Sequence, residues 1–246
     1  MFYSRPVALN RDLHRNLKLD TGTSNFAFAA NTNSILLAAS EIADAARDYP
    51  VVFIGSPGGP YTVAALLGMR DRENLFVDSD GNWASGTYLP AFVRRYPFVL
   101  AEGGPNDGEM TVCIDEDCTR LNKESGTALF DDTGAAAPLL QDTIGFMQLF
   151  HAEMQQTSLM AQRLADLGLL VGRSIEVMRG GQRYALDGIY VVDREKLGTL
   201  DDAQVVELYR SGAMYAIHAH LVSLNQAERL ATRLDARLAA QPAAAD

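Results

Sequence analysis

Cysteine is scarce in this sequence, which has two cysteines among its 246 residues. Cys113 and Cys118 are separated by four residues, so no CxxC motif indicates redox chemistry, and two thiols alone do not complete a zinc site. If Cys113 lies in a strand, residues five apart point to opposite faces, and a disulfide would need a turn between them. We therefore expect two unpaired, reduced thiols.

Positive charge is also in short supply. The formal net charge is −10 and the isoelectric point is near 4.8. Nucleic acids and anionic membranes attract clustered basic charge, so this balance argues against both as general partners. The basic residues are mostly arginines, with lysine only at Lys18, Lys123 and Lys196. Because guanidinium groups pair well with carboxylates, we expect many arginines in ion pairs or partner contacts.

Long hydrophobic runs are absent. No stretch approaches the roughly 20 apolar residues of a membrane span. The opening residues lack the basic head, continuous apolar run and small-residue cleavage site of a signal peptide. These absences predict a soluble cytoplasmic protein without a membrane span.

The sequence also lacks the common cofactor and hydrolase motifs. Pro60-Tyr61 follow the Gly-rich stretch where a P-loop would have lysine, no GxGxxG follows a strand pattern, and no GxSxG is present. The acidic run 78–82 fails as a calcium loop, because its glycine is fourth instead of sixth and the twelfth position is Leu89. We predict no cofactor.

What is present in the first half is a series of strand and turn patterns. The apolar spacing of 34–47 predicts a helix, and 51–54 with 61–69 predicts a hairpin. A third strand is expected at 74–78, reversed at Asp80-Gly81. Further on, the pattern predicts a short helix within 83–96 that has Pro90 in its first turn, and a hairpin of 98–101 with 109–114 across the turn 103–108.

The second half is dominated by helical patterns. A long helix is predicted within 135–170, with an apolar stripe wide enough for a central position or a homodimer interface. A hairpin of 175–178 with 184–192 follows. Three C-terminal helical segments are then expected, from Thr199 or Asp201 to Tyr209, over 213–224, and over 225–238 with exposed Arg229, Arg233 and Arg237. The sequence therefore predicts one α+β domain over 1–246, mainly antiparallel sheet built from hairpins, packed against a long central helix and C-terminal helices.

Two groups of residues suggest metal binding at first sight. His218 and His220 share a face only on a strand, because residues two apart on a helix lie about 200° apart. Metal ligation, packing in the core, and contact with a ligand or partner all stay open for this pair. Three carboxylates in sequence at 115–117 point to alternating sides of a strand, so we expect a solvated strand end there.

The sharpest binding signal lies in 73–100, which holds the only tryptophan and the only Arg-Arg pair. Aromatic and arginine side chains are enriched in binding hot spots. The candidates for contact with a ligand or partner are accordingly Trp83, Tyr88, Arg94, Arg95 and Tyr96. The alternative is that the aromatic side chains belong to the core and the arginines pair with acidic side chains.

Several segments, in order along nearly the whole chain, resemble the SapC family of bacterial proteins. They are YPVVF at 49–53, ENLFVDSDGNW at 73–83, YLPAFVRRYPF at 88–98, ALFDDTG at 128–134, LDGIYVVD at 186–193 and IHAHLVSL at 217–224. The family name implies an association with surface layers. Its members also occur in gene neighbourhoods with TonB-dependent receptors, tryptophan-halogenase-like proteins and cupin-like hydroxylases. The resemblance implies the halogenase-like and cupin-like proteins as possible partners.

These observations lead to three hypotheses. The first is a non-catalytic accessory protein that recognises a peptide or partner protein, because no catalytic signature is present. The second is a metal-dependent or other enzyme using His218 and His220. The third is a structural component of the surface layer or envelope.

Overall fold

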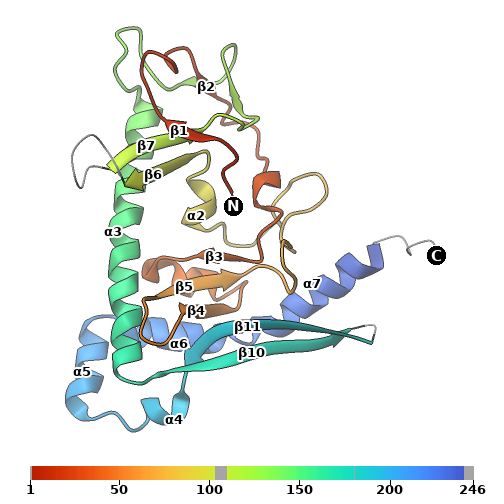
Figure 1. Ribbon diagram of the computed structural model, residues 1–246, viewed down its shortest axis with the longest axis vertical. Coiled ribbons are helices and arrows are strands. Elements are labelled where there is room, and N and C mark those ends of the chain that lie inside the picture. Colours follow the sequence, from red (N-terminus) through yellow and green to blue (C-terminus); the bar gives the residue numbers. More distant parts are fainter. Residues whose placement is uncertain (1, 103–109, 180, 241–246) are drawn as a thin grey trace.

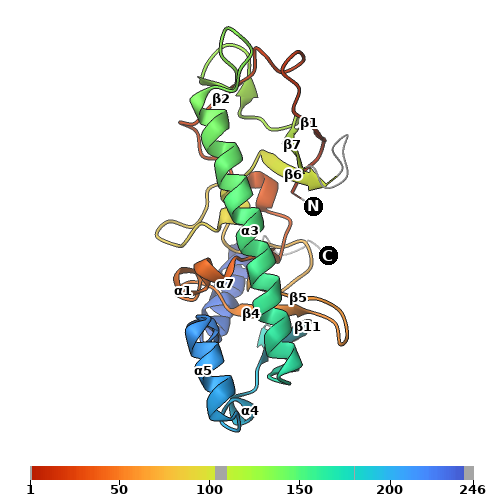
Figure 2. The same cartoon turned by 90° about the vertical axis from the view of Figure 1, so that its left-hand side faces the viewer.

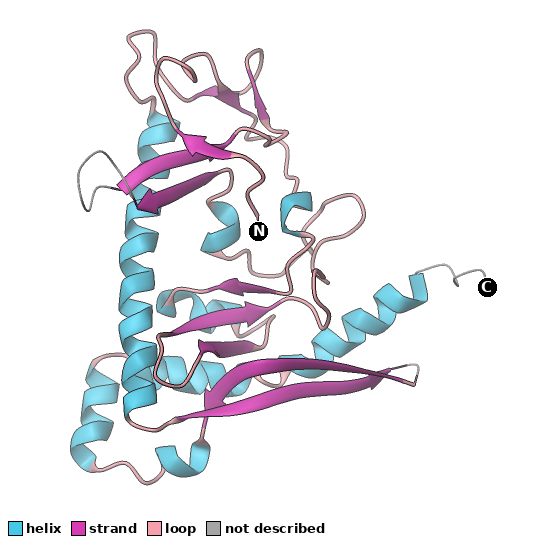
Figure 3. Cartoon of the chain, viewed as in Figure 1, coloured by secondary structure: helices cyan, strands magenta, loops and turns pink. Residues whose placement is uncertain are grey.

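The structure is a computed structural model that describes residues 2–102, 110–179 and 181–240. Every strand pair in these residues is antiparallel, and helices pack beside the sheets (Figure 3). The predicted α+β class is therefore confirmed. The turn predicted at 103–108 and the tail 241–246 lie outside the described residues.

Two three-stranded sheets occupy one end of the molecule (Figure 1). The first has the order β1-β7-β6, with β1 at Pro6–Ala8, β7 at Met110–Asp115 and β6 at Phe98–Glu102. The second has the order β8-β2-β9, with β8 at Leu121–Asn122, β2 at Lys18–Leu19 and β9 at Thr127–Ala128. The pairing of β6 with β7 confirms the second predicted hairpin.

A five-stranded sheet forms the other half, in the order β10-β11-β4-β5-β3. Its strands are β3 at Ser34–Leu36, β4 at Val51–Gly55, β5 at Tyr61–Leu66, β10 at Leu170–Arg179 and β11 at Gln182–Val192. Its two hairpins, β4-β5 and β10-β11, are the other two that the sequence predicts.

The helices are α1 at Ile42–Ala45, α2 at Ala91–Arg94, α3 at Pro138–Asp166, α4 at Arg194–Leu197, α5 at Asp202–Arg210, α6 at Ala213–Ser223 and α7 at Gln226–Ala240, with 3-10 turns at Ala27–Ala29 and Ala39–Glu41. Asp201 caps α5 as predicted, accepting a hydrogen bond of 2.8 Å from the Gln204 N–H. Gly212 separates α5 from α6 with a φ of +80°. Within the described residues, no helix is both long and apolar enough to span a membrane.

The long helix α3 runs alongside both halves of the molecule (Figures 1 and 2). Near its start it buries Leu140 and Met147 in a core with Phe98 and Ile114 from the β1-β7-β6 sheet. Near its end it buries Leu164 in the larger core of the five-stranded sheet. The central helix that the sequence predicts is thus shared by two cores.

The helix predicted over 34–47 is wrong in its first half. Residues 34–36 form the edge strand β3, paired with β5, and only Ile42–Ala45 is α-helical. Pairing with β5 satisfies backbone groups and buries Ile35, so tertiary contact overrides a local pattern that fits either structure.

The strand predicted at 74–78 is also wrong, although its turn is confirmed. A single bridge joins Val77 to Trp83, and Gly81 has a φ of +81° in the turn. The Asn74 side chain takes the place of a ladder, accepting a hydrogen bond from the Phe76 N–H at 2.8 Å and donating to the Ala29 carbonyl at 3.0 Å. Side-chain hydrogen bonds of this kind compete with strand pairing.

Two of the three arginines predicted to be exposed on α7 are half-buried. Arg233 stacks over the Phe76 ring at 4.2 Å, and Arg237 donates to the Val77 carbonyl at 2.8 Å. Arg229 is exposed as predicted. The two inward arginines hold α7 against the loop before Trp83.

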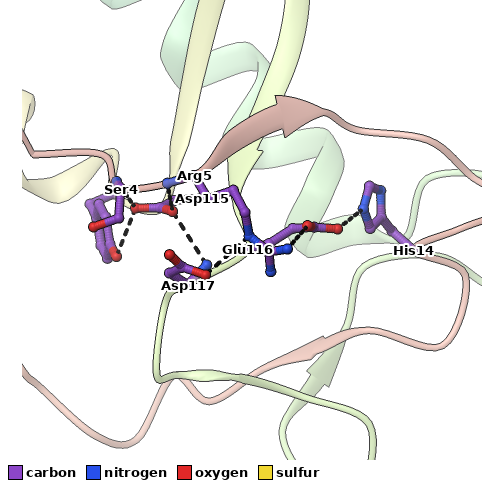
Figure 4. Close-up of polar contacts among 7 residues, drawn as sticks. Ser4, Arg5, His14, Asp115, Glu116 and Asp117 are labelled. Atoms are coloured by element: carbon purple, nitrogen blue, oxygen red, sulfur yellow. Dashed lines mark hydrogen bonds and ion pairs between the residues drawn. The ribbon is translucent and has the colours of Figure 1, made fainter.

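Asp115 is fully buried, which corrects the expectation of a solvated strand end. Its carboxylate accepts hydrogen bonds from the N–H groups of Ser4 at 2.9 Å and Arg5 at 2.8 Å (Figure 4). It also accepts one from the Tyr96 hydroxyl at 3.3 Å. Burial acts to raise the pKa of Asp115, but these donors outweigh it and hold the pKa below its ordinary value. This carboxylate fixes the start of β1.

The neighbours of Asp115 form surface ion pairs. Arg5 lies 3.2 Å from Glu116 and 3.1 Å from Asp117 (Figure 4). The buried His14 accepts from the Asn10 N–H through Nδ1, so its Nε2 carries the proton that it donates to Glu116.

His220 is buried against the five-stranded sheet and joins two of its strands. Its Nδ1 donates to the Val51 carbonyl at 2.7 Å, and its Nε2 accepts from the Val192 N–H at 3.1 Å. Ser223, one turn further along α6, accepts from the Val51 N–H at 2.9 Å. The register of β11 against β4 covers only 53–54 of β4. The hydrogen bonds between β11 and β4 do not extend to Val51, so His220 and Ser223 satisfy the backbone N–H and carbonyl of this residue instead.

We expect acid to weaken the fold through His220. Burial lowers its pKa to about 4, below the ordinary value of 6.5, so the unfolded chain takes up the proton first as the pH falls. The neutral His220 ring contributes fully to the free energy of unfolding above pH 6.5, and about 3 kcal/mol of this contribution is lost by about pH 4. Urea denaturation followed by Trp83 fluorescence at several pH values measures it.

The matched control is the exposed His218 on the same helix. His220→Gln is expected to lower the unfolding free energy by about 2 kcal/mol at neutral pH and to flatten its dependence between pH 4 and 6.5. His218→Gln should leave both unchanged. Parallel pH profiles for His220→Gln and the unchanged protein would contradict this role.

We expect Asp115→Asn to destabilise the protein by about 2 kcal/mol, because an amide cannot accept all the hydrogen bonds of the carboxylate. Hydrogen exchange at the Val7 amide of β1 should accelerate with it. Asp117→Asn is the control, since the Asp117 side chain is 51% exposed and its pair with Arg5 contributes about 0.5 kcal/mol or less. Equal effects of the two substitutions would refute the anchoring role of Asp115.

Candidate binding site

The short helix α2 lies between the β1-β7-β6 sheet and β3, beside α3 (Figure 1). Its first N–H, at Ala91, donates to the buried Glu41 carboxylate at 2.7 Å. The same carboxylate accepts from the Tyr88 hydroxyl at 2.9 Å and from the Ala38 N–H at 3.1 Å. Glu41 therefore fixes where α2 begins and hence where Arg94 and Arg95 lie.

The two arginines of this segment have different surroundings. The Arg94 side chain is 46% exposed, lies 4.0 Å from Glu41, and sits over the Phe146 ring at 5.3 Å. Arg95 is half-buried, and its guanidinium lies 4.0 Å from the centre of the Phe92 ring. Arg94 is thus an ion-paired surface residue, whereas Arg95 points among aromatic rings.

The charge of Arg95 has no acidic partner within the described part of the chain. Its guanidinium also faces Phe150 at 5.5 Å and Tyr3 at 5.9 Å, and its buried Nε has no hydrogen-bond partner. Contacts of a cation with aromatic faces contribute about 0.5–2 kcal/mol each. These contacts leave the buried Nε of Arg95 without an acceptor, and a buried donor without a partner is costly.

Two adjoining cavities meet at Arg95 and share Leu36, Phe92 and Arg95 as lining residues. One has a volume of about 340 Å³ and is also lined by residues of β3, Val99 of β6, and the N-terminal Phe2 and Tyr3. The other, of about 210 Å³, is also lined by Leu100 of β6 and by Met147, Phe150, His151 and Met154 of α3. Among the described residues that line them, none is acidic.

Two further ionisable side chains line the cavities. His151 is half-buried, and its Nε2 accepts from the Gln155 side-chain amide at 3.0 Å, which leaves the proton on Nδ1. The Tyr3 hydroxyl donates to the Phe98 carbonyl at 2.9 Å. Burial raises the pKa of Tyr3, and the nearby positive charge of Arg95 opposes that rise. The cavities thus hold one fixed positive charge in an apolar setting.

The three aromatic candidates are built into the fold. Trp83 donates through Nε1 to the Tyr49 hydroxyl at 3.2 Å, and Tyr96 stacks on Phe28 with ring centres 3.8 Å apart. The Tyr88 hydroxyl is held by Glu41, and burial raises the pKa of Tyr88 above its ordinary value. These three rings support α2 and do not line either cavity.

His218 and His220 do not come together. Both lie on α6, where His220 is buried with both ring nitrogens hydrogen-bonded, and His218 is exposed with its Nδ1 donating to the Met214 carbonyl at 2.7 Å. The two rings point to opposite sides of one helix and cannot ligate one ion. Nor do the described residues contain a group of three or more His, Cys, Asp or Glu side chains able to hold a metal ion.

Both cysteines are unpaired in the structure, as predicted. Cys113 is half-buried, and burial raises the pKa of its thiol, so the reactive thiolate is disfavoured. Cys118 is buried near Tyr96. This arrangement gives neither thiol the environment of a catalytic cysteine.

A family model described as SapC matches residues 9–230. The chain belongs to the SapC family. The matched span contains α2, Arg95 and all of α3, and it leaves out Phe2 and Tyr3 at the cavity wall. No curated protein and no solved structure matches the chain.

Reasoning from the sequence identified Arg95 but missed its surroundings. Phe92 and Phe150 lie within the helical patterns at 83–96 and 135–170, which do not show that the two rings meet, and Tyr3 lies in a stretch without a pattern. The available signal was His151, a titratable residue on the apolar stripe of a long helix. It gives no indication that α2 packs beside it.

We expect Glu41→Ala to destabilise the protein by about 3 kcal/mol, because it leaves the Ala91 and Ala38 N–H groups without their acceptor. Chemical denaturation measures this loss. Asp44→Ala is the matched control, since the Asp44 side chain is 62% exposed and 4.0 Å from Arg47, and should change stability by about 0.5 kcal/mol or less. A stability of Glu41→Ala within that range would show that Glu41 does not position α2.

Proposed function

We propose that this SapC-family protein is a non-catalytic accessory protein that binds a peptide or a segment of a partner protein in the two cavities around Arg95. The observation that carries the proposal is the Arg95 guanidinium, which has no ion-pair partner among the described residues and lies between two cavities whose described lining contains no acidic residue. A guanidinium offers a fork of donors suited to a bound acceptor group.

The charge balance of the chain supports this proposal. Acidic residues outnumber basic ones by 31 to 21, and some of the arginines pair with carboxylates, such as Arg70 with Glu73 and Arg163 with Glu207. Arg95 has no such partner among the described residues, and it is half-buried beside two cavities. These surroundings leave the Arg95 guanidinium available to an acceptor group of a bound ligand.

The sheet edges beside Arg95 favour an extended chain as the ligand. β3 ends the five-stranded sheet and β6 ends the β1-β7-β6 sheet, and residues of both strands line both cavities (Figure 1). No described strand pairs with the outer edge of either. An extended peptide can pair with such an edge while its side chains enter neighbouring pockets.

The cavity volumes fit side chains better than a large cofactor. Pockets for small molecules typically measure about 300–1,000 Å³, and these cavities measure about 340 and 210 Å³. Apolar side chains of a bound segment would meet Phe92, Leu36 and Phe150 there. The placement of His218 and His220 gives no comparable support to a metal-dependent enzyme.

The test exposes the immobilised protein to a pool of synthetic hexapeptides with free ends. Mass spectrometry then identifies the peptides that the protein retains. We expect peptides to be retained. Arg95→Met should weaken their binding at least about tenfold, because it removes a charge-assisted hydrogen bond. Arg94→Ala is the control and should change binding by less than about twofold. Undiminished binding to Arg95→Met would exclude this site, provided that circular dichroism shows both variants folded.

A further inference from the structure

We propose that the group bound at Arg95 is the free C-terminal carboxylate of a peptide or protein whose last side chains are apolar. This inference rests on the proposed function and adds the chemistry of the recognised end.

The charge of the site matches one negative charge. Arg95 supplies one fixed positive charge, and His151, with its Nε2 accepting from Gln155, supplies an Nδ1–H donor without further fixed charge. Sites for doubly charged phosphate groups use clusters of arginines. Within the described lining residues the cavities contain a single arginine, so a singly charged carboxylate is the better match.

The lining distinguishes a chain end from an acidic side chain within a chain. A carboxylate in mid-chain brings a polar backbone on both sides, and each buried N–H or C=O without a partner costs about 1–3 kcal/mol. The 210 Å³ cavity is lined, apart from Arg95 and His151, by the apolar residues Leu36, Phe92, Leu100, Met147, Phe150 and Met154. A terminal carboxylate at Arg95 ends the backbone there, and its own side chain fills this apolar space.

The remaining cavity gives the direction of the bound chain. The 340 Å³ cavity is lined by Thr32, Ser34, Ile35 and Leu36, which follow the edge strand β3 and its approach. Backbone groups along this edge can pair with the residues that precede the terminus. The chain would then enter along β3 and end at Arg95, beside α3 (Figure 1).

The experiment compares hexapeptides ending in Leu, Ile, Met or Phe as free acids and as C-terminal amides, labelled at the N-terminus and measured by fluorescence anisotropy. We expect the free acids to bind at least about tenfold more tightly than the amides. An amide lacks the negative charge and cannot make the charge-assisted bidentate contact with a guanidinium. Arg95→Met should abolish this difference, Arg95→Lys should keep part of it, and Arg94→Ala should keep all of it.

The outcomes separate this inference from the proposed function. Equal binding of acids and amides, or Arg95-dependent binding of peptides through an internal Asp or Glu, overturns the terminal carboxylate and leaves peptide binding in place. Binding of decanoate at Arg95 without binding of any peptide overturns both and points to a fatty acid. Thermal denaturation of each variant shows that the fold is retained, and Arg95→Met is suited to this test because Met fits an apolar cavity.

Discussion

The packing of α3 against two cores is the constraint on which the rest of the structure depends. Leu140 and Met147 belong to the core of one half, and Leu164 to the core of the other. Both halves are thereby tied to one rigid element, and the edges β3 and β6 are held near the same stretch of α3. The site at Arg95 exists because Phe150 and His151 lie on α3 between the two points of attachment.

Buried polar groups in this protein serve the backbone. Asp115 holds the start of β1, Glu41 holds the start of α2, and His220 joins two strands of the five-stranded sheet. In each case the hydrogen bonds offset the cost of removing a polar group from water. Arg95 differs from these three, because its guanidinium lies among aromatic rings and its buried Nε has no hydrogen-bond partner. That contrast is the reason for proposing Arg95, and none of these three, as a binding residue.

Much of the fold follows from local patterns. The hairpins β4-β5 and β10-β11, the helix α3 and the cap at Asp201 are all visible in turn residues and apolar periodicity. Residues 34–36 were misassigned because a short apolar run fits either a helix or an edge strand, and only pairing with β5 decides. The exposure of Asp115 was misjudged for a similar reason, since its donors at Ser4 and Arg5 are over 100 residues away in the chain.

The sequence by itself determined the α+β class, the order of most elements and membership of the SapC family, because these depend on neighbouring residues and their spacing. It also indicated Arg95, without distinguishing it from Arg94. Only the tertiary structure decided which arginine is paired, which histidine is buried, and which aromatic side chains line a cavity. Tyr3, Phe92 and Phe150 come from three separate segments of the chain, and the surroundings of a charge depend on all side chains packed around it.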